Sequence, residues 1–181
     1  MSKTVSASFA MLLALAGTMA PAYGAVLKRL YLASNGSATG ADGDGTLRWG
    51  PWERDTSDKL PAASKSAVVY TTAPLDRQVQ TTGNITVDFY AASDTRDVGL
   101  SATVEDVQPD GTVTVLSTKP LSASATPDKA AFYSLDLGDV SHAFLSGHRI
   151  RVEISTTAAS ANQRVLHSIA RPSALVLRVE E

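Results

Sequence analysis

Cysteine is absent from all 181 residues of the sequence. Without thiolates the chain cannot form disulfides, ligate a metal through cysteine or use a thiol as nucleophile. Aromatic residues are scarce at 6%, and 16 basic residues nearly balance 18 acidic ones. Such a chain lacks the positive surface that binds nucleic acid or an anionic membrane. Thiol chemistry is thus excluded, and a nucleic-acid partner is not expected.

Long hydrophobic runs are also missing. The apolar stretch Phe9 to Met19 is shorter than the roughly 20 residues of a transmembrane helix. Lys3 precedes it, and Ala20-Pro21-Ala22 and Ala22-Tyr23-Gly24 both place small residues where a signal peptidase cleaves. We expect residues 1–24 to be a signal peptide, the alternative being an uncleaved anchor. The mature chain 25–181 is then secreted or periplasmic and not an integral membrane protein.

Short stretches of alternating apolar and polar residues fill the rest of the chain, which is typical of half-buried strands. No helical period is sustained after the apolar leader. Turn residues recur every 8–12 positions, as in Pro109-Asp110-Gly111. Nine to eleven short strands are predicted, over 27–33, 47–49, 67–72, 78–81, 85–90, 98–107, 112–116, 131–137, 150–155, 165–169 and 174–179. This pattern predicts an all-β, two-sheet jelly-roll sandwich.

Residues 34–66 are rich in glycine, serine, aspartate and proline and predict one long surface loop. Both tryptophans of the chain, Trp49 and Trp52, lie in it. With Tyr31 they could form an aromatic platform for a sugar or a peptide. The alternative is that the tryptophans fix the loop onto the sandwich.

The stretch from Ser141 to Ser155, SHAFLSGHRIRVEIS, combines a glycine turn with a core strand. In order with YTTAPL (70–75), VEDVQPDG (104–111) and RPSALVL (171–177), it resembles the C-terminal β-sandwich domain of X-Pro dipeptidyl-peptidases and cocaine esterases. The resemblance covers the mature chain and implies a jelly roll similar to galactose-binding domains. It implies a structural role for the motif residues Asp106, Asp110, Gly111, His142, Gly147, His148, Arg149 and Arg151.

In that family an α/β-hydrolase domain carries the catalytic serine, aspartate and histidine. No such domain is recognisable here, so no catalytic residue can be assigned. We therefore expect an exported, non-catalytic accessory or binding module, whose partner is a separate α/β-hydrolase, a peptide or a glycan. The alternatives are a piece of a serine hydrolase with dipeptidyl-peptidase or esterase activity and a structural envelope protein.

Three other groups of residues are candidate sites. Gly36-Ser-Ala-Thr-Gly40 is the nearest string to a nucleophile elbow, but its serine is one place too early. His142 and His148 with a carboxylate such as Asp139 could ligate a metal, but hydrogen bonds to backbone around a tight corner are expected instead. Asp42 and Asp44 form a fragment of a calcium loop, for which a solvated turn is the simpler interpretation. No cofactor is expected beyond such a structural calcium.

Overall fold

A computed structural model describes residues 24–61, 67–157 and 162–180 of the chain. The predicted signal peptide, except Gly24, lies outside the described residues. The described parts contain eleven strands and no helix. They therefore contain no helix long and apolar enough to cross a membrane.

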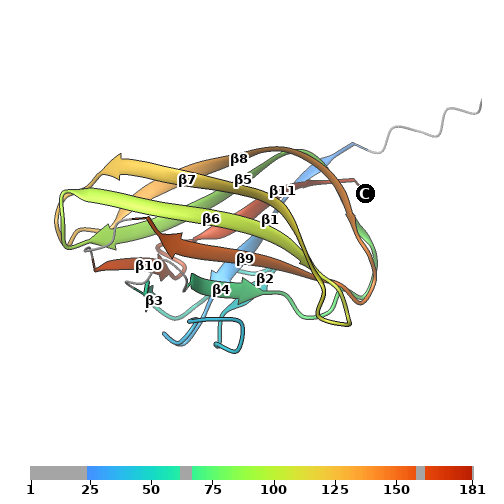
Figure 1. The fold of residues 1–181 in the computed structure, drawn as a ribbon, viewed down its shortest axis with the longest axis horizontal. Helices are drawn as coiled ribbons and strands as arrows, with labels where there is room; N and C mark the ends of the chain where they lie inside the picture. The colour runs from blue at the N-terminus through green and yellow to red at the C-terminus, as the bar shows by residue number, and fades with distance from the viewer. Residues whose placement is uncertain (1–23, 62–66, 158–161, 181) are drawn as a thin grey trace, which may run out of the picture.

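The strands form two layers that face each other across one core (Figure 1). In the first layer β5 (Val79–Ser93) lies between β8 (Ala131–Phe144) on one side and β11 (Ala174–Val179) and β10 (Gln163–His167) on the other. The pairing continues from β11 to β1 (Val26–Ala33) and from β10 to β3 (Thr56–Lys59). These pairs are all antiparallel.

The second layer has the order β4 (Ala67–Thr71), β9 (Arg149–Thr156), β6 (Asp97–Val107) and β7 (Val113–Ser124). The short strand β2 (Thr46–Arg48) joins the layers, since it pairs with β1 and, through Thr46 and Thr71, with β4. Apart from that single parallel bridge the pairing is antiparallel. The all-β sandwich that the sequence predicts is confirmed.

The alternation that predicted β9 also explains its packing. Ile150, Val152 and Ile154 are fully buried, whereas the arginines and the glutamate between them face outward. Ile85, Val87 and Phe89 of β5 are likewise fully buried and meet them from the other layer. Burying a side chain of this size stabilises the fold by about 1.5–3 kcal/mol. The core is thus built from the apolar positions of the strand pattern.

Strand lengths differ from the sequence-based expectation. The two segments expected at 78–81 and 85–90 are one strand, β5, because Gly83 at a φ of +105° continues the chain without ending the pairing. Similarly, β8 runs through Gly138, where a bulge absorbs its positive φ of +87°. The long loop contains one strand that was not expected, β3. At both glycines the sequence pattern predicts a turn, whereas the structure has an irregularity in continuous strand pairing.

Candidate functional site

A cleft of about 650 Å³ opens beside the first residues of β1. Its walls come from β1, the residues after β2, the end of β11 and the segment that leads into β5. We refer to this hollow as the cleft. The residues that line it are Leu27, Lys28, Arg29, Tyr31, Trp49, Leu75, Asp76, Arg77, Gln78, Val79, Val179 and Glu180. Aromatic, aliphatic and charged side chains of both signs therefore meet in one concave surface.

Two of the three aromatic residues proposed as a platform line this cleft. Tyr31 and Trp49 both contribute to its wall, and Trp49 is 53% exposed. Leu27, also in the lining, is 63% exposed. Large apolar side chains left in a concave surface are typical of a contact with another molecule. A ligand-binding role for Tyr31 and Trp49 stays a prediction.

Trp52 does not join them. Its indole N–H donates to Oγ1 of Thr56 at 3.1 Å, and its ring lies 5.4 Å from the guanidinium of Arg48 and 5.7 Å from that of Arg54. These contacts fix the loop to β3, as the alternative interpretation of the tryptophans expected. The two tryptophans, three positions apart, therefore have different surroundings.

Some of the charged side chains that line the cleft already form ion pairs within the domain. Arg29 donates to Asp88 at 2.9 Å, and Asp88 also accepts from the hydroxyl of Ser134 at 2.7 Å. Asp76, Arg77 and Glu180 also line the cleft, and no ion pair within the described residues engages them. The cleft therefore offers one cation and two anions to a partner.

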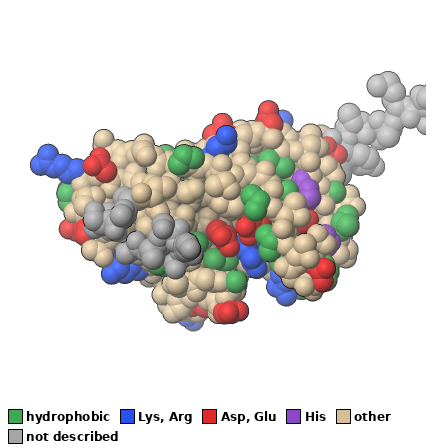
Figure 2. Space-filling model, viewed as in Figure 1, with side chains coloured by type: hydrophobic (Ala, Val, Ile, Leu, Met, Phe, Trp, Pro, Cys, Tyr) green, Lys and Arg blue, Asp and Glu red, His purple; other side chains and the backbone are tan. Residues whose placement is uncertain are grey.

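His142 and His148 meet one carboxylate at the end of the sandwich near the cleft. Nε2 of His142 lies 2.8 Å from Oδ2 of Asp106, and Nδ1 of His148 lies 2.8 Å from Oδ1 of the same side chain. Asp106 is buried, with 6% of its side chain exposed. We call these three residues the histidine corner; Figure 2 shows histidine side chains reaching the surface at this end.

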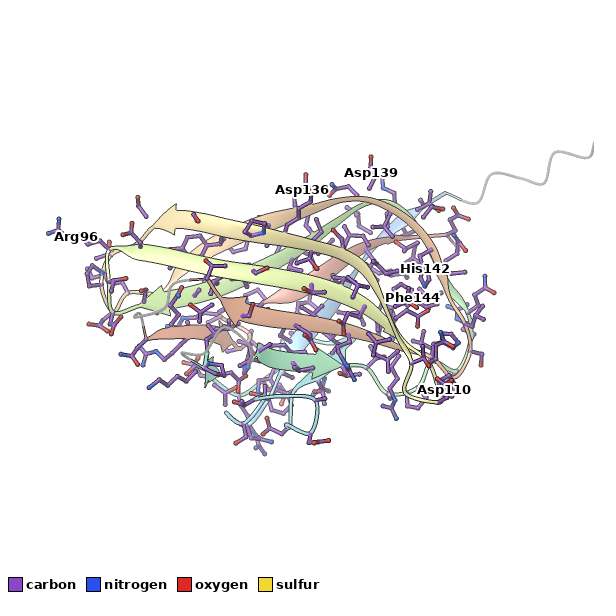
Figure 3. The ribbon with its side chains drawn as sticks, viewed as in Figure 1. Arg96, Asp110, Asp136, Asp139, His142 and Phe144 are labelled. Atoms are coloured by element: carbon purple, nitrogen blue, oxygen red, sulfur yellow. The ribbon has the colours of Figure 1, made fainter. Side chains whose placement is uncertain are left out.

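Neither the backbone partners expected for these two imidazoles nor the alternative carboxylate, Asp139, is the group that they contact. Asp139 lies at the outer edge of β8, away from His142 (Figure 3). The two imidazoles bond to the side chain of Asp106 and not to the backbone, because strand β6 brings Asp106 between them. In the part of the chain that the structure describes, no three or more His, Cys, Asp or Glu side chains are arranged so that they could hold a metal ion.

The remaining motif residues form the turns and strand around this corner. Asp110 accepts from the amide of Thr112 at 2.9 Å, and this bond, together with the Thr112 side chain, lowers the pKa of Asp110. Gly111 and Gly147 have φ values of +87° and +83°, which favour glycine. Arg149 donates to the carbonyl of Thr72 at 3.0 Å, and Arg151 to the hydroxyl of Thr71 at 3.3 Å.

Asp44, one of the two calcium candidates, accepts hydrogen bonds from backbone amides. The amide of Asn35 donates to it at 2.9 Å and that of Ser37 at 3.2 Å. Asp42 is exposed on the same loop. The Asp44 carboxylate thus closes the loop that was considered as a nucleophile elbow, and calcium binding stays a prediction.

A second cluster of polar side chains was not foreseen from the sequence. Oδ2 of Asp58 accepts from the hydroxyls of Ser34 at 2.6 Å and Tyr70 at 2.8 Å, and lies 2.8 Å from Nε2 of His167. Oδ1 accepts from the amide of Ala38 at 3.0 Å. No local motif predicts this cluster, because its residues come from three strands and one loop that are far apart in the sequence.

The hydrogen bonds within this cluster favour the ionised form of Asp58. Burial alone would raise the pKa of Asp58, but the hydrogen bonds from His167, Ser34, Ala38 and Tyr70 together lower it. Burial also raises the pKa of Tyr70 well above its ordinary value, as does the charge of Asp58, so the phenol remains a donor.

Serine, histidine and aspartate together suggest a hydrolytic triad, but the arrangement differs. In a triad the two ring nitrogens of histidine serve serine and aspartate separately. Here Nε2 of His167 faces both Asp58 and Ser34, Nδ1 contacts Thr56, and Ser34 donates to Asp58. His167 is also fully buried. This cluster therefore holds the long loop against the sandwich.

The family model for the X-Pro dipeptidyl-peptidase C-terminal non-catalytic domain matches residues 15–174. The chain belongs to this family. Two proteins named as serine esterases, from Mycobacterium bovis and Mycobacterium tuberculosis, are each 27% identical to it over 126 residues. That match covers 55% of this chain and 20% of either relative.

Solved structures share the fold of this X-Pro dipeptidyl-peptidase C-terminal domain. A CocE/NonD family hydrolase from Staphylococcus aureus has a TM-score of 0.75 at 12% identity, over 87% of this chain and 37% of that one. An aminopeptidase from a marine sediment Thaumarchaeota archaeon has a TM-score of 0.72 at 19% identity, with the same coverage. The domain thus spans about a fifth of its curated relatives and little more than a third of these solved chains.

Proposed function

We propose that this domain is an exported, non-catalytic module that packs against the catalytic domain of a serine hydrolase, and that the cleft is the docking surface. The observation that carries the proposal is the position of the cleft. Its wall includes Leu27, Lys28 and Arg29, which directly follow Val26, the first residue of β1. Where a catalytic domain precedes a C-terminal domain in one chain, the two domains are joined at this end of the sandwich.

The composition of the cleft supports protein docking. Half-exposed Trp49 and exposed Leu27 provide apolar area, and Arg77 and Asp76 can pair with charges on a partner. Buried aromatic anchors ringed by polar groups are the usual source of binding energy at protein interfaces. A glycan would use the same aromatic faces, but the aliphatic residues of the lining favour a protein.

A second candidate follows from the lengths of the relatives. Because the matched part is a fifth of the esterases, the domain could be the C-terminal part of one hydrolase chain with esterase or dipeptidyl-peptidase activity. Docking through the cleft is common to both candidates. They differ in whether the catalytic domain belongs to the same chain.

Capture of a serine hydrolase by the mature protein tests the docking. The protein is immobilised, incubated with an envelope fraction of the source cells, and bound serine hydrolases are labelled with a fluorescent fluorophosphonate. We expect a labelled hydrolase that is lost with Trp49→Ala and Leu27→Ala. Phe132→Ala and Ile169→Ala are matched controls, since Phe132 and Ile169 are 52% and 62% exposed and lie outside the cleft.

Each other result has a clear meaning. Labelling of the module itself contradicts a non-catalytic role. Equal loss of capture with cleft and control variants contradicts docking through the cleft. Export is tested by N-terminal sequencing of the mature protein from the envelope fraction, which is expected to begin at Tyr23 or Ala25.

A further inference from the structure

One wall of the cleft, Leu75 to Val79, connects β4 to β5 and depends on its neighbours for its position. The turn between β8 and β9 supplies them. The amide of Leu75 donates to the carbonyl of His148 at 2.8 Å, and the amide of Gly147 donates to the carbonyl of Leu75 at 2.8 Å. The hydroxyl of Ser146 donates to the carbonyl of Asp76 at 3.1 Å. The position of the first residues of this wall therefore depends on the β8–β9 turn.

The position of this β8–β9 turn depends on Asp106 of β6. His148, whose carbonyl receives the amide of Leu75, holds its ring 2.8 Å from Oδ1 of Asp106. Gly147 beside it has a φ of +83° and packs toward Pro109 of the β6–β7 turn. Asp106 thus connects a second strand to the backbone that holds Leu75.

The other oxygen of Asp106 reaches the far end of the same wall. His142 lies 2.8 Å from Oδ2, and its ring meets the edge of Phe144 at a centroid distance of 4.8 Å. Phe144 pairs with Val79, the last residue of the wall. Figure 3 shows His142 and Phe144 together at this end of the molecule.

We infer that Asp106 is a positioning residue for the cleft. Through His148 it sets the position of Leu75, and through His142 and Phe144 that of Val79, so one buried carboxylate fixes both ends of the wall that carries Asp76 and Arg77. This inference rests on the proposed function, because the wall matters only if the cleft docks a partner.

Amide hydrogen exchange on the free mature protein tests the inference. In Asp106→Ala the amides of Leu75 and Gly147 are expected to exchange at least about tenfold faster than in the wild type, since two hydrogen bonds to a charged group are lost. The amide of Asp128, which donates to the carbonyl of Ser93 at the opposite end of β5, is expected to be unchanged. Asp136→Ala is the matched control, because Asp136 lies on β8 and accepts from Asn84 outside the corner.

Unchanged exchange at Leu75 and Gly147, or an equal rise at Asp128, overturns the inference, since the latter indicates general destabilisation. If Asp106→Ala does not fold, Asp106→Asn, which keeps one accepting oxygen, is expected to give the same local pattern to a smaller extent. Because exchange is measured without a partner, its outcome does not depend on capture. Failure of capture by the wild type contradicts the proposed function alone.

Discussion

Two buried carboxylates on different sides of this sandwich have very different supplies of hydrogen-bond donors. Asp58 is surrounded by donors from Ser34, Ala38, Tyr70 and His167. Glu105 of β6, with 9% of its side chain exposed, has an oxygen, Oε2, that accepts no hydrogen bond from any described residue. Its nearest cation, Nη1 of Arg151, is 3.7 Å away, too far for a hydrogen bond.

Asp106, which faces two histidines, has an intermediate number of hydrogen-bond donors. The pKa shifts of Asp58 and Glu105 agree with the difference in their donor supply. Hydrogen bonds lower the pKa of Asp58, whereas burial and the charge of Glu153 raise that of Glu105. The comparison teaches that burial alone does not decide what a carboxylate contributes to stability; the number of donors facing it does.

Removing the best-supplied carboxylate is expected to have the largest effect. Asp58→Ala leaves His167 and three other donors buried without an acceptor, and we expect a loss of about 3–5 kcal/mol in the free energy of unfolding. Urea denaturation measures it. Asp55→Ala is the control, because Asp55 is 67% exposed and its pair with Arg171 is worth less than about 1 kcal/mol. A similar loss in both variants would contradict the role of the cluster.

The stabilising effect of Asp58 is expected to depend on pH. Because its folded pKa is lowered, its contribution is complete above the unfolded pKa of about 3.9 and is lost as pH falls through the folded value. The difference in unfolding free energy between wild type and Asp58→Asn should therefore be constant near neutral pH and shrink below about pH 4. Denaturation series from pH 7 to pH 2.5 measure it; a difference that grows in acid would contradict the ionised state of Asp58.

The histidine corner is expected to show an intermediate effect. His148→Ala removes one of two donors to Asp106, and a loss of about 1–3 kcal/mol is expected. Thermal and urea unfolding at pH 7 measure it. His142→Ala is a graded comparison, since the His142 side chain is 24% exposed against 14% for His148, and it should cost less. The reverse order would contradict burial as the reason.

Glu105 is expected to give the smallest effect, and of opposite sign. Its folded pKa is raised, so the ionised side chain lowers stability at pH 7 and ceases to do so as pH falls below the normal glutamate value of about 4.3. Glu105→Gln should stabilise the fold by up to about 1 kcal/mol at pH 7 and have no benefit at pH 4. Destabilisation at pH 7 would show that the pair with Arg151 outweighs the missing donor.

Much of the fold could be predicted because alternation is a local property. The outward arginines and inward aliphatic residues of β9 follow from the period of a strand, and the positions of ten of the eleven strands were foreseen in outline. The family, too, could be recognised from short motifs in the right order. The lengths of β5 and β8 could not, because whether a glycine ends or only bends a strand depends on its partner strand.

The candidate site was predictable only in part. Tyr31 and Trp49 could be singled out as unusual aromatics, but Trp52, three positions further on, points to Thr56 instead, which only the docking of β3 decides. His142 and His148 were found from their spacing, but their acceptor lies about 40 positions away on β6. Asp58 and His167, 109 positions apart, left no signal in the sequence at all.

The sequence by itself determined the strands, their inward faces and the absence of thiol chemistry, because each depends on residue type and on near neighbours. The tertiary structure alone decided which carboxylate each histidine meets and which aromatic residues share a cleft. Those contacts join residues tens of positions apart, and a buried charge is stable only where the folded chain happens to bring it enough donors.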